Sequence, residues 1–177
     1  MIGHGQYQHI VGMASSESLR RIGMANLSVG CVCVGLQSIV TVMAYVYHGL
    51  YAWNWDAPLL SKCMTGVFTG SVCLVLSYIQ LDAARVFRKL TQTDLSQRIC
   101  SIKLFSCFLL LFGLLLFGIS LYLITVLFRW LAVTANEYEH FVRGPVMVSV
   151  ILNVGLALVA VCTVCLALLG LFALPDL

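Results

Sequence analysis

The sequence contains very little charge. Only 10% of its 177 residues are Asp, Glu, Lys or Arg, whereas about a quarter of the residues of an ordinary soluble domain are charged. Hydrophobic residues make up 61% of the chain, and its mean hydropathy is +1.00. This composition excludes a soluble globular domain.

The apolar residues are gathered in four long runs, at residues 24–47, 59–81, 104–133 and 146–174. About 20 consecutive apolar residues cross the hydrocarbon core of a bilayer as a helix. Backbone groups in lipid must also find partners within the protein, which excludes a single open sheet. The sequence therefore predicts an all-α integral membrane protein, built as a bundle of four transmembrane helices.

Ionisable side chains are absent from the middle of all four runs. A proton relay, a voltage sensor or a haem held by membrane histidines would need such side chains. The four histidines lie at positions 4, 9, 48 and 140, in the predicted N-terminal segment and loops. We therefore expect no metal site, no cofactor and no catalytic residue.

Half of the positive charge is gathered in one short segment, residues 82–103. Lys and Arg accumulate in cytoplasmic loops and set the orientation of membrane proteins. The segment is therefore expected to form a short cytoplasmic hairpin, with both termini and residues 1–23 also cytoplasmic. Clustered basic residues attract anionic lipid, so we expect contact with lipid or a protein partner, not nucleic acid. The basic residues are Arg85, Arg88, Lys89, Arg98 and Lys103.

Two further sets of residues are typical of membrane helices. Tryptophan and arginine at the ends of spans anchor them at the headgroups, and the candidates are Trp53, Trp55, Arg129 and Trp130. Small and polar residues inside spans let helices approach closely or hydrogen-bond to each other. The predicted packing residues are Gly66, Gly70, Gln37 and Asn153.

Eight cysteines are spread through the chain, and most are expected to be small packing residues. Cys162 and Cys165 form a CxxC pair, a spacing that supports disulfide exchange in oxidoreductases. The predicted outer loops contain no cysteine that could exchange with this pair. Because of this missing exchange partner, a membrane thiol oxidoreductase is ranked only as the second alternative function.

The helix order resembles that of the claudin and peripheral-myelin-protein superfamily. The stretch EYEHFVRGPVMVSVILNVGLALVAVC, which begins at residue 137, is similar to the claudin entry into the fourth helix. His-Gly-Leu-Tyr at residues 48–51 resembles the Gly-Leu-Trp of the claudin first loop. The claudin loop is long, carries two cysteines and folds as a small extracellular sheet, whereas this loop is short and has no cysteine pair. The resemblance implies the helix order but not a paracellular pore, and it assigns no functional residue.

The leading prediction is a non-enzymatic tetraspan protein. It would act as an accessory or assembly subunit of a channel, receptor or junction complex by lateral association with other membrane proteins. We expect it to form a hetero- or homo-oligomer with membrane proteins. The first alternative is a self-assembling pore lined by Gln37, Ser38 and Asn153, and lipid handling stays open. The first twenty residues lack a cleavable secretory signal, so the first span is expected to be an uncleaved anchor in the plasma membrane.

The predicted orientation can be tested at Asn26. Asn26-Leu27-Ser28 is a formal N-glycosylation sequon. It lies at the cytoplasmic end of the first span, so we expect no glycan there. Treating the expressed protein with an endoglycosidase should leave its mass unchanged. A loss of mass that maps to Asn26 would show that the chain has the opposite orientation in the membrane.

Overall fold

The computed structural model describes residues 4–46, 65–86, 92–134 and 143–172, which form four α-helices. The helices are α1 (His4–Val46), α3 (Thr65–Val86), α4 (Gln92–Thr134) and α5 (Arg143–Phe172). Each contains a stretch long and apolar enough to cross a membrane, at Ser16–Met43, Thr65–Arg85, Gln97–Arg129 and Val146–Phe172. The prediction of an all-helical, multi-pass membrane protein with four spans is confirmed.

Two of the helices begin well before the apolar runs that predict them. Helix α1 begins at His4 rather than near residue 24, and α4 begins at Gln92 rather than near residue 104. Hydropathy marks only the part of a helix that lies in lipid, whereas backbone hydrogen bonding continues through polar sequence. The predicted hairpin of residues 82–103 therefore contains the last turn of α3 and the first three turns of α4.

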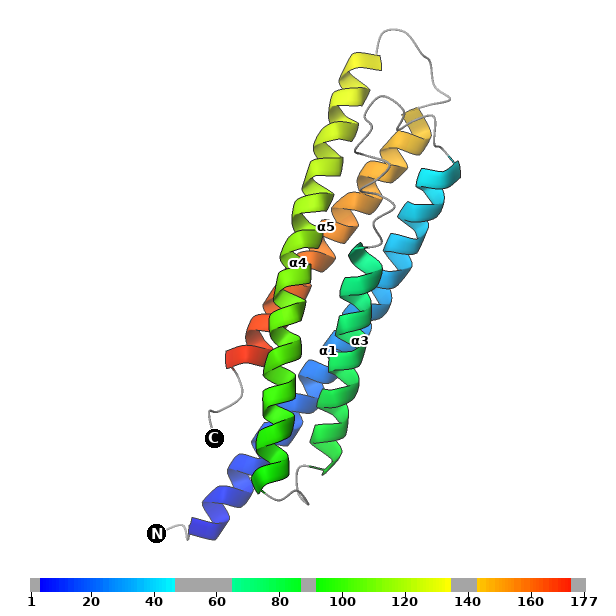
Figure 1. The fold of residues 1–177 in the computed structure, drawn as a ribbon. Coiled ribbons are helices and arrows are strands. Elements are labelled where there is room, and N and C mark those ends of the chain that lie inside the picture. The colour runs from blue at the N-terminus through cyan, green and yellow to red at the C-terminus, as the bar shows by residue number, and fades with distance from the viewer. Residues whose placement is uncertain (1–3, 47–64, 87–91, 135–142, 173–177) are drawn as a thin grey trace.

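Consecutive helices run antiparallel (Figure 1). Helix α1 packs against α3 and α5, and α4 packs against the same two helices, so the four form a ring in chain order. The most extensive contacts join α1 to α3 and α4 to α5, so the bundle consists of two antiparallel helix pairs. The beginning of α1, the end of α3, the beginning of α4 and the end of α5 share one end of the bundle (Figure 1). That this end is cytoplasmic stays a prediction from the basic residues.

The described helices bury many polar side chains and expose many apolar ones. Every helix turns large apolar side chains outward, such as Val42, Phe68, Leu111 and Ile151. Many polar side chains are buried, which is the expected arrangement where hydrocarbon rather than water surrounds the protein. The buried polar residues are Asn26, Gln37, Thr41, Thr65, Thr69, Ser77, Gln80, Ser106, Ser120, Ser149, Asn153 and Thr163.

Glycines bring the backbones of α1 and α3 into direct contact. A Cβ built on Gly70 would lie 2.8 Å from the carbonyl oxygen of Gly30 and 2.6 Å from Cγ2 of Val34. A Cβ on Gly30 would in turn lie 3.0 Å from the carbonyl oxygen of Gly70. A Cβ on Gly66 would lie 2.7 Å from Oε1 of Gln37. Gly66 and Gly70 thus serve packing within the chain, and the space that a side chain would fill is taken by α1.

Gly70→Ala is expected to lower the free energy of unfolding by about 1–3 kcal/mol, because the added methyl group meets a backbone oxygen of α1. Gly118→Ala is the matched control, since nothing lies within 4 Å of a Cβ at Gly118 and alanine is the better helix former. Thermal unfolding of the two purified variants in one detergent measures the difference. A Gly70→Ala protein as stable as the wild type would contradict the close contact.

Candidate functional site

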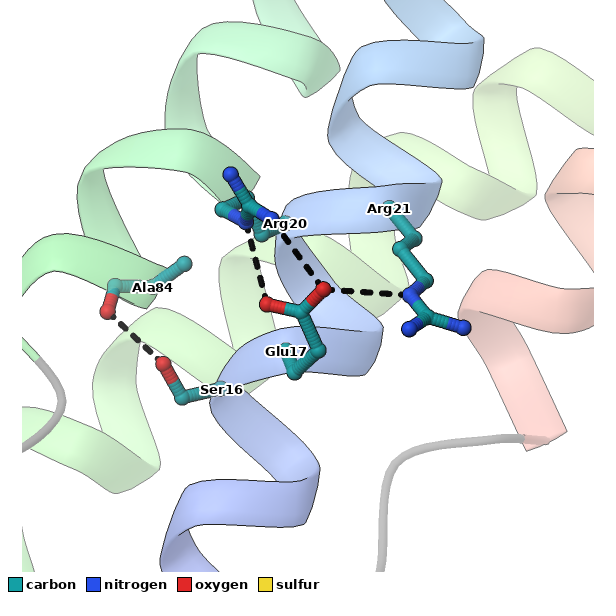
Figure 2. A network of polar contacts seen from close by, with 5 residues as sticks. All are labelled: Ser16, Glu17, Arg20, Arg21 and Ala84. Atoms are coloured by element: carbon teal, nitrogen blue, oxygen red, sulfur yellow. Dashed lines mark hydrogen bonds and ion pairs between the residues drawn. The ribbon is translucent and has the colours of Figure 1, made fainter.

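A cluster of charged side chains lies on α1 where its membrane span begins (Figure 2). Arg20 donates from Nε and Nη2 to the two carboxylate oxygens of Glu17 at 3.0 and 3.1 Å, and Arg21 donates from Nε at 3.1 Å. Residues three and four positions apart share a face of a helix. Two guanidinium groups share one carboxylate, so the cluster keeps an excess positive charge. The side chains are 44–79% exposed, so the pairs add little stability but face outward.

The same part of α1 is fixed to α3 by hydrogen bonds from side chains to backbone. Ser16 Oγ donates to the carbonyl oxygen of Ala84 at 3.0 Å (Figure 2). About two turns further along α1, the carbonyl oxygen of Gly23 accepts a hydrogen bond from Ser77 Oγ at 2.7 Å. A bond between helices fixes their register as well as their separation. The charged cluster is therefore carried on a helix that cannot slide along its partner.

Asp82 of α3 and Arg98 of α4 form an ion pair across the two helices, and both side chains are about one-third exposed. Of the predicted basic contact residues, Arg98 is thus already paired with an acid. Arg85 is exposed in the last turn of α3, and Lys103 is half-buried. Arg88 and Lys89 lie outside the described residues. That these basic residues form a contact surface for lipid or a protein partner stays a prediction.

Small residues form a row along the outward side of α1. Ser28, Cys31, Gly35 and Ser38 are all exposed and follow one another at steps of three or four residues. We call these four residues the α1 outer stripe. The same spacing continues through exposed Met24 to the charged cluster. Both serine hydroxyls donate to carbonyl oxygens of α1 itself, and nothing lies within 4 Å of a Cβ at Gly35.

A second polar group lies inside the bundle, where all four helices meet. Asn26 of α1, Gln80 of α3 and Ser106 of α4 are each 0% exposed. Asn26 Nδ2 donates to Gln80 Oε1 at 2.8 Å. Helix α5 contributes Gly170, where a Cβ would lie 2.4 Å from Ser106 Oγ and 3.8 Å from Gln80 Nε2. We call these four residues the four-helix polar cluster.

This cluster is incompletely hydrogen-bonded by protein atoms. Among the described residues, Asn26 Oδ1, Gln80 Nε2, Ser106 Oγ and Asn153 Oδ1 are buried without a hydrogen-bond partner, and three of these four atoms belong to the cluster. A buried polar atom without a partner costs about 1–3 kcal/mol. Among the described residues, most of the buried polar atoms without a partner therefore lie in this one cluster.

The residues predicted to line a pore do not share a surface. Gln37 and Asn153 are buried, whereas Ser38 is exposed on the outside of α1. Asn153 Nδ2 donates to the carbonyl oxygen of Ser149 at 2.8 Å, and Gln37 Nε2 donates to Thr41 Oγ1 at 3.5 Å. Gln37 and Asn153 lie inside one chain's own bundle. They are not placed where neighbouring copies could enclose an axis.

Cys162 and Cys165 are both exposed on α5 and lie within its span. Among the described residues, no three His, Cys, Asp or Glu side chains are grouped as metal ligands. A redox role for Cys162 and Cys165 stays a prediction.

The predicted headgroup anchors fall largely outside what the structure describes. Trp53 and Trp55 lie outside the described residues, and the side chain of Trp130 is not described. Arg129 is exposed and is the last residue of the span in α4. That position is compatible with an anchoring role at the membrane boundary.

Three residues of the four-helix polar cluster, Asn26, Ser106 and Gly170, were not predicted from the sequence to pack or bond inside the bundle. Asn26 drew notice only as part of a sequon, and Ser106 did not stand out in its leucine-rich run. An asparagine inside an apolar span is costly unless it is hydrogen-bonded. That cost was the available signal for Asn26, but the sequence does not show that its partner is Gln80.

Comparisons with known proteins found no matching protein family, curated protein or solved structure. The likeness to claudins rests on the sequence motifs alone. What the chain does must therefore be argued from its own surfaces.

The hydrogen bond between Asn26 and Gln80 can be tested with a double-mutant cycle. We expect the two single substitutions to lower the free energy of unfolding by more, in sum, than the double substitution does. Gln80→Leu leaves Asn26 Nδ2 without an acceptor and is expected to lower the free energy of unfolding by about 1–3 kcal/mol. In the Asn26→Leu/Gln80→Leu protein both partners are apolar, so its loss should be smaller than the sum of the two single losses. Gln97→Leu, at an exposed position of α4, controls for the substitution itself. Strictly additive losses would contradict a direct bond.

Proposed function

We propose that this protein is a non-enzymatic subunit that associates laterally with another membrane protein and helps to assemble or modulate it. The contact would use the α1 outer stripe together with the charged cluster of Glu17, Arg20 and Arg21. The observation that carries this proposal is that row of small residues on the outside of a span. Small residues let the backbone of a second helix approach closely in lipid.

The contrast between glycines supports this role for the stripe. Gly23, Gly30, Gly66 and Gly70 all contact another helix within 4 Å at the position of a missing Cβ, whereas Gly35 and Gly118 do not. Gly118 lies among exposed large side chains such as Leu114, Leu115 and Tyr122, whereas Gly35 belongs to a row of small residues. Glycine in a helix is about 1 kcal/mol less favourable than alanine. Gly35 therefore weakens α1 without serving the packing of its own bundle, as expected if it serves packing against a second protein.

Charge argues for a different protein as partner rather than a second copy. Two copies that met symmetrically through this side of α1 would bring together four arginines and only two glutamates. Like charges that face each other at an interface oppose association. A partner helix with an acidic residue at the same membrane boundary would instead complete the pairing of Arg20 and Arg21.

Anionic headgroups are expected to surround the same end of the bundle. Arg20, Arg21 and Arg85 are exposed there, and basic residues next to a span are attracted to the negatively charged cytoplasmic leaflet. A plasma-membrane location with this end in the cytoplasm is part of the proposal. The buried positions of Gln37 and Asn153 lend no support to the pore alternative.

The test is the mass and composition of the complex extracted gently from the native membrane. We expect the wild-type protein to migrate with a larger, different membrane protein. Gly35→Leu should release it, because the leucine side chain holds the partner helix away. Gly118→Leu places the same side chain on the outside of α4, where nothing lies within 4 Å of a Cβ, and should leave the complex intact. A wild-type monomer, or a complex that survives Gly35→Leu, would refute the proposal.

A further inference from the structure

The four-helix polar cluster has no part in the proposed lateral contact, because its side chains are buried. Asn26, Gln80 and Ser106 are each 0% exposed, and Gly170 is also buried. The surrounding core is apolar and includes Leu76, Ile102 and Leu109. The cluster is thus a buried group of polar side chains within an apolar core, with members on all four helices.

The atoms without a protein partner form a complementary set. Asn26 Oδ1 is an acceptor, Gln80 Nε2 carries two N–H donors, and Ser106 Oγ can both donate and accept. The hydrogen bond from Asn26 Nδ2 to Gln80 Oε1 fixes which end of each amide is left over. Because the leftover set includes a donor and an acceptor, what binds there must itself accept and donate.

None of the three side chains in the cluster can ionise, so a charged ligand would have no counter-charge among them. A neutral ligand of very small size fits this chemistry. Buried water molecules in proteins characteristically make about three hydrogen bonds to polar groups that lack other partners. We infer that the four-helix polar cluster is a binding site for a water molecule, which accepts from Gln80 and donates to Asn26, with a third hydrogen bond to Ser106.

Such a water would join the two helix pairs. Asn26 and Gln80 belong to α1 and α3, whereas Ser106 belongs to α4. The direct bond between Asn26 and Gln80 stays within the first pair. The bound water extends it to the second pair, and Gly170 leaves the room in which Ser106 Oγ sits, because a Cβ there would lie only 2.4 Å away.

The site also lies close to one end of the bundle. Gln80 is six residues before the end of α3, and Gly170 is two residues before the end of α5. At 1.5 Å per residue, six helical residues span about 9 Å. Water can therefore exchange with the aqueous phase at the end that holds Arg20, Arg21 and Arg85, without crossing the whole bilayer.

Water-edited solid-state NMR of the full chain in phospholipid bilayers tests this site directly. Magnetisation from water should reach the side-chain amides of Asn26 and Gln80 nearly as fast as that of Gln97, which is exposed. The backbone amide of Leu109, buried in the same core, is the dry reference. Amides of Asn26 and Gln80 that polarise no faster than that of Leu109 would overturn the proposal.

The Ser106→Ala variant provides a second test, since this substitution removes only one hydroxyl group. If Ser106 binds the water, the variant should slow transfer to the Gln80 amide by about twofold, since one of roughly three bonds to the water is lost. The midpoint of thermal unfolding should also fall. If Ser106 Oγ bound no water, removing it would leave the midpoint of thermal unfolding unchanged or raise it, and that result would contradict the proposal. Ser28→Ala is the control, since that hydroxyl is exposed and donates to its own helix.

Discussion

The contact between the backbones of Gly30 and Gly70 is the constraint on which the rest of the bundle depends. It sets the separation of α1 and α3 at a distance that no side chain would permit. At that separation Ser77 Oγ reaches the carbonyl oxygen of Gly23, and Cys33 Sγ reaches that of Gly66 at 3.2 Å. The first helix pair is therefore fixed along its length by backbone contacts and by side chains that bond to backbone.

The second pair uses the same principle with fewer groups. A Cβ on Gly113 of α4 would lie 2.7 Å from Oγ1 of Thr163 on α5, and Thr163 donates to the carbonyl oxygen of Ala160 on its own helix. The two pairs then meet through a mixture of apolar packing and isolated polar groups. Lipid offers no hydrophobic drive for helices to associate, so close packing and buried polar contacts determine which helices pair.

Hydropathy predicted the four spans because it depends only on how many apolar residues follow one another. It could not show which way each residue faces, because the spans are apolar on all sides. Gln37 and Ser38 are neighbours with similar sequence surroundings, yet one is buried and the other lies on the outside of α1. Gly70 and Gly118 are both span glycines, and only the first contacts another helix. These differences are set by contacts between helices that are distant in sequence, as is the pairing of Asn26 with Gln80.

Helix α1 begins well before its membrane span. Residues 4–15 precede the membrane span without a break in the helix, and twelve helical residues extend about 18 Å. The start of α1 projects beyond the other helices at that end of the bundle (Figure 1). Because Ser16 is bonded to α3 immediately after this segment, a lateral force on the projection is delivered to both helices of the first pair. A movement of this projecting segment would therefore act on α1 and α3 together rather than on α1 alone.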